Sequence, residues 1–179
     1  MAAILDAAVE LLGERPDASM ADVAAAAGVV RQTVYAHFES RAALLSAVAA
    51  RALETTLAAI EAAELDSGTP EAALERLIDA WGRSVLSHAR VLEALRSDPL
   101  IVADVHDFHA PVLAQIERLV QRGQHSGAFD AELPVSWVSA AFLGLIHTAA
   151  GEVASGRLGA EDAARALQRS VTRLFGVPQ

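Results

Sequence analysis

Residues 23–45 read VAAAAGVVRQTVYAHFESRAALL and predict two short helices joined by a sharp turn. Gly28 is the expected turn residue, because glycine readily adopts the left-handed backbone conformation in which a helix ends. We expect the second helix over residues 31–38, where Val34 and Phe38 are four positions apart and therefore share one face. A helix of that length is not stable by itself, so its apolar edge must pack on a neighbouring helix while its polar edge points outward. This is the arrangement of the helix-turn-helix, whose second helix enters the major groove of DNA.

The same stretch resembles the signature of the tetracycline-repressor (TetR) family of bacterial transcription regulators. The resemblance extends over residues 2–50 and depends on the joint spacing of Gly28, Thr33, Tyr35, Phe38 and Leu44. It implies an all-α protein of about nine helices. A three-helix, helix-turn-helix DNA-binding head is expected at residues 1–45, and a helical ligand-binding and dimerisation domain at residues 46–179. A plain helical hairpin is the alternative interpretation of the motif.

The resemblance also implies which side chains contact DNA: Ser19, Arg31, Gln32, Thr33, Tyr35, His37 and Arg41. Arg31 and Gln32 are the expected base readers, because a guanidinium can donate two hydrogen bonds to guanine and an amide can pair with adenine in the same bidentate way. The hydroxyl and imidazole groups of the set are expected at phosphates, which position a protein without specifying sequence. Arg41 stands where the family commonly has Lys, at the start of the next helix, where its charge and the helix N-terminus both attract a phosphate.

Several of these positions also have a plainer interpretation. Ser19 is suited to act only as an N-cap, with Asp22 three residues later in the place of a capping-box acid. For Arg31 the alternative is a solvated surface charge. For Tyr35 it is packing under the turn, and for His37 it is an inert surface position.

Val30 is the irregular position of the second helix, because the family usually has Ser or Thr there as the helix cap. Loss of such a cap costs ~1 kcal/mol of stability. The departure puts in doubt a phosphate contact from this position, but not the fold. We expect Val29 and Val30 to pack beneath the turn.

Composition narrows the classes of protein that remain. The chain has 179 residues, 53% of them hydrophobic, and its predominance of Ala, Leu, Glu and Arg favours a nearly all-helical fold with a large core. It has no Cys, which excludes disulfides, thiolate zinc sites and cysteine nucleophiles. We find no apolar run of the ~18 residues that span a bilayer and no secretory signal pattern, so we expect a cytoplasmic protein without a membrane partner.

The net charge of −9 is unusual for a DNA-binding protein, but the charge is unevenly distributed. Residues 1–50 contain three arginines against six acidic residues, whereas residues 28–51 contain three arginines against the single acid Glu39. Positive charge is therefore concentrated around the second helix of the motif. Because few phosphates would be neutralised, we expect the DNA affinity to depend only weakly on salt.

Turn residues divide the rest of the chain into helices. Ser40 is the expected cap of a long helix that reaches residue 64 and joins the two domains as a rigid rod. Residues 66–70 (DSGTP) form the clearest break, after which Thr69 caps and Pro70 begins the next helix. Further helices are expected from Asp98-Pro99 to Val105, from Pro111 onward, over residues 137–153, and at the C-terminus.

The last two predicted helices contain a candidate dimer interface. Small residues spaced along residues 137–153 would let another helix approach closely, and the resemblance implies that both helices pair with their counterparts in a second subunit. The predicted interface residues are Ala140, Gly144, Thr148, Gly151, Leu167, Val171 and Leu174. The alternative is that both helices are internal core of one protomer.

The resemblance implies a ligand cavity among the middle helices. The candidate lining residues combine apolar and aromatic walls with a few polar groups, as small-molecule pockets do; they are Trp81, His88, His106, His109, Ile116 and Phe142. Ordinary core packing is the alternative for each. His106 and His109 lie three apart with Asp104 and Asp107 interleaved, but this spacing matches no established metal motif, so we expect no metal and no cofactor.

These features predict a homodimeric transcription regulator. We expect a repressor that binds a palindromic double-stranded DNA operator and is released by a small-molecule effector. Two rival interpretations stay open: a helical metal-dependent enzyme that uses His106, His109 and nearby acids, and a helical protein-interaction module whose DNA-binding head has lost its function. Because no nucleophile, base and metal-ligand set is arranged in the sequence, we expect no enzymatic activity.

Overall fold

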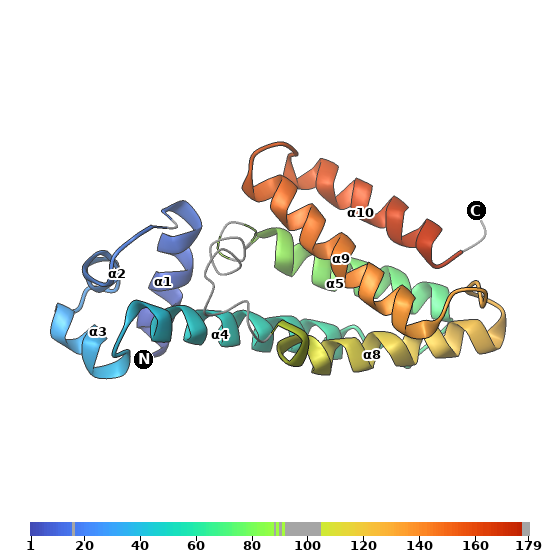
Figure 1. The fold of residues 1–179 in the computed structure, drawn as a ribbon, viewed down its shortest axis with the longest axis horizontal. Coiled ribbons are helices and arrows are strands. Elements are labelled where there is room, and N and C mark those ends of the chain that lie inside the picture. The colour runs from blue at the N-terminus through green and yellow to red at the C-terminus, as the bar shows by residue number, and fades with distance from the viewer. Residues whose placement is uncertain (16, 88, 90, 92–104, 177–179) are drawn as a thin grey trace.

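The computed structural model describes residues 1–15, 17–87, 89, 91 and 105–176, and the side chains of residues 84, 85, 87 and 105–109 lie outside this description. The described residues form eight helices and no strand, which confirms the all-α prediction. With the labels of Figure 1 the helices are α1 (Ala2–Glu14), α2 (Met20–Ala26), α3 (Arg31–His37), α4 (Arg41–Ala62), α5 (Pro70–Ser87), α8 (Val105–Ser126), α9 (Val135–Ala154) and α10 (Ala160–Leu174). The short helix predicted to start at Asp98-Pro99 lies outside the described residues.

The helices form a small head and a larger bundle that are joined by one long helix (Figure 1). α1, α2 and α3 pack together at one end of the molecule, and α4 extends from this head toward the bundle. α5 is the central helix of the bundle, because it contacts α4, α8, α9 and α10. The most extensive helix pairing is between α9 and α10, which lie side by side along one edge.

Buried apolar side chains hold the head together, among them Ile4, Ala8, Leu12, Val23, Leu44 and Leu45. Val34 is 0% exposed and Phe38 is 5% exposed, so the apolar edge of α3 packs as predicted. Gly28 has φ of +66°, which confirms the left-handed turn. Val30 is 69% exposed, so the prediction that it packs beneath the turn is wrong. It precedes α3 in an extended conformation, where successive side chains point to opposite sides, and Val29 packs against the head core in its place.

α4 contributes to two separate cores. Its first half supplies Leu44, Leu45, Val48 and Ala49 to the head core, and its second half supplies Leu53, Leu57 and Ile60 to the bundle core. The change therefore occurs after Ala49, a little beyond the predicted division at residue 45. Because the continuous helix α4 belongs to both cores, the structure has no break in the chain that would mark a domain boundary there. The predicted boundary at residue 45 therefore remains a prediction.

Helix starts follow the predicted caps, with one exception. The Ser40 side chain accepts the N–H of Ala43 at 3.1 Å, and α5 begins at Pro70 after the predicted cap at Thr69. The exception is Pro111, which lies inside α8 and does not begin a helix. The prediction of a restart there is wrong, because an internal proline removes one backbone hydrogen bond and bends a helix without necessarily ending it.

Aromatic side chains from different helices meet in the bundle core. The ring of Trp81 in α5 lies 5.3 Å from that of Phe142 in α9, and Phe142 lies 6.0 Å from Phe175, which follows α10. Phe175 in turn makes an edge-on contact at 5.1 Å with Phe129, which follows α8. Each of these rings is at most 4% exposed. These contacts fix α5, α8, α9 and α10 relative to one another.

Two arginines hold the turn between α4 and α5. Glu64 in this turn has a left-handed φ of +47°. Arg76 of α5 and Arg122 of α8 donate hydrogen bonds to the carbonyl oxygens of residues 63–68 at 2.6–3.1 Å. A cationic donor strengthens each such bond relative to a neutral one. The C-terminal end of α4 is thus attached firmly to the bundle.

α4 and α9 are each long and apolar enough to cross a membrane by length and composition alone, which corrects the expectation that no such segment exists. Core helices of soluble proteins meet the same criteria. Both helices supply side chains to the cores described above. Only 33% of each apolar window is buried within the protomer, so part of their apolar surface faces outward in a single copy.

Candidate nucleic-acid interface

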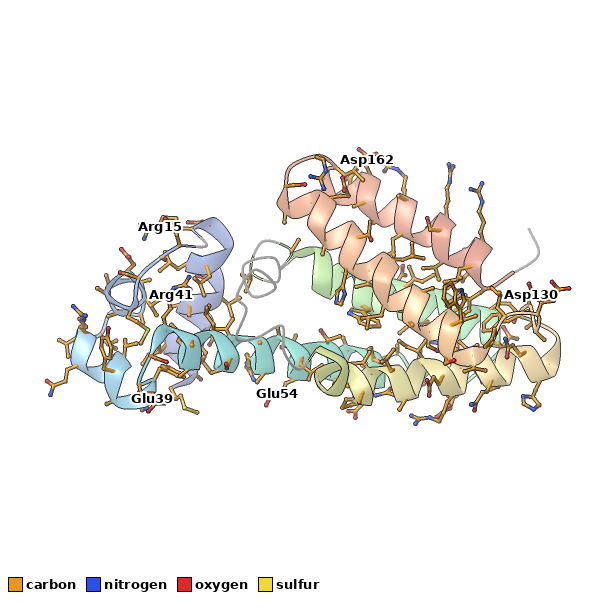
Figure 2. All side chains as sticks on the ribbon, viewed as in Figure 1. Arg15, Glu39, Arg41, Glu54, Asp130 and Asp162 are labelled. Atoms are coloured by element: carbon orange, nitrogen blue, oxygen red, sulfur yellow. The ribbon has the colours of Figure 1, made fainter. Side chains whose placement is uncertain are left out.

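α3 presents its polar side chains at the end of the molecule that is farthest from the bundle (Figure 2). Arg31, Gln32, Tyr35 and His37 are exposed, and Thr33 is half-buried. Tyr35 is 40% exposed, so the alternative that it packs under the turn is wrong. The helix has no acidic side chain. Its polar edge is therefore free of groups that would repel a phosphate backbone.

Arg31 and Tyr35 are held against each other on this edge. Nη2 of Arg31 donates a hydrogen bond to the hydroxyl oxygen of Tyr35 at 3.1 Å, and the guanidinium carbon lies 5.1 Å from the centre of the ring. Residues four apart on a helix are neighbours, and a guanidinium over an aromatic ring is attracted by its negative face. The predicted base reader and the predicted phosphate contact thus form one unit.

Ser19 caps α2 in the predicted manner. Its hydroxyl oxygen accepts the N–H of Asp22 at 3.2 Å, and the Asp22 carboxylate accepts the N–H of Ser19 at 2.8 Å. The hydroxyl of Ser19 also donates to that carboxylate. These side-chain and backbone hydrogen bonds from Ser19, together with the nearby charge of Arg15, hold the pKa of Asp22 below its usual value. A phosphate contact from Ser19 remains a prediction, and the neighbouring carboxylate opposes it.

Arg41 begins α4 and is half-buried rather than fully exposed (Figure 2). Its Nε donates a hydrogen bond to the carbonyl oxygen of Ala18 at 3.3 Å, which connects α4 to the loop before α2. The side chain therefore supports the position of the motif. Its predicted contact with a phosphate remains a prediction.

Charges on the head are segregated. The acidic residues of α1 are exposed on the flank, at Asp6, Glu10 and Glu14. Asp22 is paired with Arg15 at 3.7 Å. Around α3 the acid nearest in sequence is the exposed Glu39. The distribution that the sequence predicted is therefore found, with acid on α1 and an acid-free α3.

The predicted ligand-lining residues are only partly described. Trp81, Ile116 and Phe142 come together in the bundle core, where they are at most 3% exposed. Their arrangement agrees with the alternative of ordinary core packing. His88 and the side chains of His106 and His109 lie outside the described residues, so the cavity lining remains a prediction.

A surface pocket of about 400 Å³ lies instead where the end of α4 meets α8. It is lined by Ile60, Glu61, Glu64, Leu65, Asp66, Ser67, Gln115 and Arg118, and it includes none of the predicted lining residues. The sequence did not indicate it, because its walls come from segments that are far apart along the chain. Its acidic residues and its openness to solvent distinguish it from an apolar ligand cavity.

The predicted dimer residues fall into two groups. Ala140, Gly144 and Thr148 are exposed, and Gly151 and Leu174 are half-buried, so they have surface available to a partner. Leu167 and Val171, in contrast, are 4% and 0% exposed in the bundle core of a single chain. We exclude these two residues from the proposed interface, because their side chains are already buried within one chain. The sequence could not show this, since periodicity predicts an apolar helix face but not the neighbour that covers it.

Trp137 is a functional candidate that the sequence analysis missed. It is 63% exposed at the start of α9, the largest exposure of an aromatic side chain among the described residues. Its spacing of three and seven residues from Ala140 and Gly144 places it on the same helix face. This spacing could have indicated that Trp137 belongs to the predicted interface. It was missed because an apolar residue at helical spacing usually belongs to the core.

Residues 4–48 match the family model for bacterial regulatory proteins of the tetR family. An HTH-type transcriptional repressor, LfrR of Mycolicibacterium smegmatis, is 34% identical over 150 residues, which span 81% of this chain and 74% of LfrR.

Solved structures extend the likeness to the whole fold. LfrR from Mycobacterium smegmatis in complex with proflavine has a TM-score of 0.74 at 30% identity, over 96% of this chain and 93% of that one. The TetR-family regulator PfmR from Thermus thermophilus has a TM-score of 0.73 at 25% identity, over 95% and 97%. The fatty acid degradation regulator FadR from Bacillus halodurans has a TM-score of 0.81 at 17% identity, over 97% and 93%, and shows likeness of fold alone.

Proposed function

The chain belongs to the tetracycline-repressor (TetR) family of bacterial transcription regulators, and on this basis we propose that it is a homodimeric repressor released from a palindromic operator by a small molecule. As a member of this family it is a DNA-binding regulator and not an enzyme, which sets aside the metal-dependent enzyme considered from the sequence. Its place of action would be the cytoplasm, where the DNA of a bacterium lies.

The main support for the operator contacts is the geometry of α3. The fully buried Val34 anchors this seven-residue helix, and its opposite edge is polar, exposed and free of acids. In the proposal Arg31 and Gln32 read base edges in the major groove. The side chains assigned to phosphates are Thr33, Tyr35 and His37.

The main support for a dimer is the outward face of α9. This 20-residue helix contains one charged residue, Glu152, and its outward face presents Trp137 beside small side chains. A second copy related by a two-fold axis would place the indole of one subunit against the small residues of the other. The same axis would present two copies of α3 to successive major grooves, about 34–36 Å apart.

The dimer is tested by enlarging a small residue on that face. Gly144→Leu adds a bulky side chain at an exposed position where the new Cβ would have no atom of another helix within 4 Å, so the protomer can accept it. We expect the variant to sediment as a monomer where the parent sediments as a dimer. Ala114→Leu, at an exposed position of α8, is the matched control and should stay dimeric. A dimeric Gly144→Leu protein would contradict the proposed interface.

Release by an effector is proposed from the LfrR complex with proflavine and from the way α4 joins both parts. The head packs on the first half of α4, and Arg76 and Arg122 attach its far end to the bundle. A ligand that repositions bundle helices would move α4 with them and change the separation of the two heads. Binding of ligand and operator would then oppose each other reciprocally.

Operator binding is tested by selecting bound duplexes from a random DNA pool. We expect a two-fold symmetric consensus with half-sites one helical turn apart. Arg31→Ala should lose the preference at one base pair of each half-site. If no sequence is enriched, a protein-interaction module with a non-functional head becomes the better interpretation.

Proflavine is the first probe for the effector site. We expect it to raise the melting temperature of the DNA-free protein, because a ligand that binds only the folded state stabilises it. It should also weaken operator binding in a titration. A parallel titration with a non-operator duplex is required, since a planar aromatic cation can also stack on DNA. Proflavine binding that leaves operator affinity unchanged would refute the switch while leaving the DNA-binding proposal intact.

A further inference from the structure

The contact between Arg31 and Tyr35 indicates how the base-reading side chain is oriented. An exposed arginine has several rotatable bonds and loses conformational entropy when it is ordered on DNA. Here one hydrogen bond of 3.1 Å and a ring contact at 5.1 Å already restrain it in the DNA-free protein. Ordering a side chain before binding reduces the free-energy cost of the complex.

Both side chains keep the donors that DNA would require. The hydroxyl of Tyr35 accepts from Arg31 through a lone pair, so its own proton is available to a phosphate oxygen. The guanidinium has five N–H donors, and the contact with Tyr35 uses one on Nη2. The bidentate pairing of arginine with guanine needs only two donors. The contact is therefore compatible with both proposed roles at once.

We infer that Tyr35 is a positioning residue, which connects a phosphate contact to base reading by Arg31. A phosphate bound at the tyrosine hydroxyl fixes the ring, and the ring and hydroxyl oxygen fix the guanidinium over one base pair. The base that Arg31 recognises is a guanine in the operator half-site, next to that phosphate. This inference rests on the proposed operator binding. It adds that Tyr35 contributes to sequence selectivity and not only to affinity.

The test measures discrimination rather than affinity alone. The base pair read by Arg31 is identified first as the one at which Arg31→Ala loses selectivity, by ~10-fold or more. Tyr35→Phe keeps the ring but removes the hydroxyl oxygen, so we expect selectivity at that base pair to fall by about 2- to 10-fold. Tyr35→Leu removes both contacts and should lose more. In the Arg31→Ala background neither change should reduce selectivity further.

His37→Ala is the matched control, because His37 lies on the same helix, six residues from Arg31, and is assigned to a phosphate. It should weaken binding to all sequences by the same factor. We expect only small changes in melting temperature for the Tyr35 variants, since Tyr35 is exposed at the surface of a short helix.

Three results would overturn the inference. Tyr35→Phe could weaken binding to all sequences equally, as is expected for His37→Ala, and the tyrosine would then be a phosphate contact only. Its effect on selectivity could persist in the Arg31→Ala background, which would show that it does not act through Arg31. Arg31→Ala could leave selectivity unchanged at every base pair of a symmetric operator, which would refute the inference while operator binding stands. A parent protein that selects no sequence would instead refute the proposed function itself.

Discussion

A serine in place of Val30 should strengthen the start of α3. Val30 is the N-cap residue, with φ of −75° and ψ of 149°, and α3 has no side-chain cap hydrogen bond. The same chain already caps α4 and α5 with hydroxyl groups, at Ser40 and Thr69. Because the backbone at position 30 is extended, as the capping conformation requires, a hydroxyl there can accept an N–H of the first turn.

Two opposing contributions set the change in unfolding free energy: the helix cap that serine adds and the hydrophobic burial that is lost with valine. A capping serine stabilises a helix by ~1 kcal/mol relative to alanine. Removing the valine loses little hydrophobic burial, because the residue is 69% exposed. Val30→Ala loses the same burial without supplying an acceptor, so it is the matched reference. We therefore expect Val30→Ser to exceed Val30→Ala by ~1 kcal/mol in unfolding free energy, or about 2–4 °C in Tm.

The measurement is urea-induced unfolding of both variants at one protein concentration, since association also stabilises a dimer. Midpoints are compared at equal slope, so that the difference reports the folded state. Equal midpoints for the two variants would refute the reasoning. They would mean that the first-turn N–H groups of α3 already have partners as good as a serine oxygen.

Four further substitutions test other parts of the structure. In Gly123→Ala the new Cβ would lie 1.9 Å from a ring carbon of Phe129, so we expect a loss of ~1–3 kcal/mol by chemical unfolding. Gly82→Ala, whose nearest neighbour would be at 3.6 Å, should be neutral or stabilising. Arg122→Leu removes hydrogen bonds to three carbonyls at the end of α4 and should lower stability by ~1.5–3 kcal/mol in the same assay. The hydrogen bonds of the α2 cap lower the pKa of Asp22, so its charged form stabilises the folded state above about pH 4. This contribution disappears as the pH falls through the folded-state pKa. Asp22→Asn should therefore lose less stability than the parent on acidification, and an equal loss would contradict the assignment.

Local rules predicted the turn, the buried edge of α3 and the cap of α2 in the head, but not the exposure of Val30. The four-residue spacing of Val34 and Phe38 specified which edge of α3 is buried, and Gly28 specified the turn. The turn depends on a single residue and the apolar edge on a spacing of four residues, so both could be recognised locally, although helices α1, α2 and α4 supply the core that covers this edge. The N-cap at Ser19 was predictable for the same reason, because its partner Asp22 is three residues away.

The rules failed for two different reasons. Pro111 predicted a helix start, yet α8 continues through it, because a proline bends a helix without necessarily ending it. Leu167 and Val171 predicted an apolar face, and the structure shows that α10 turns this face toward its own bundle. A periodic pattern specifies that a face is apolar, but the packing of other helices decides what covers it.

By itself, the sequence determined the order of the helices, the turn at Gly28 and the polar edge of α3, because spacing, caps and turn residues act along the chain. Only the tertiary structure decided that Trp137 is exposed, that Arg76 and Arg122 hold the end of α4, and that α4 serves two cores. The physical reason is range. Hydrogen bonds from Arg122 to the α4–α5 turn join residues more than 50 positions apart, and the free energy of such contacts depends on how whole helices pack.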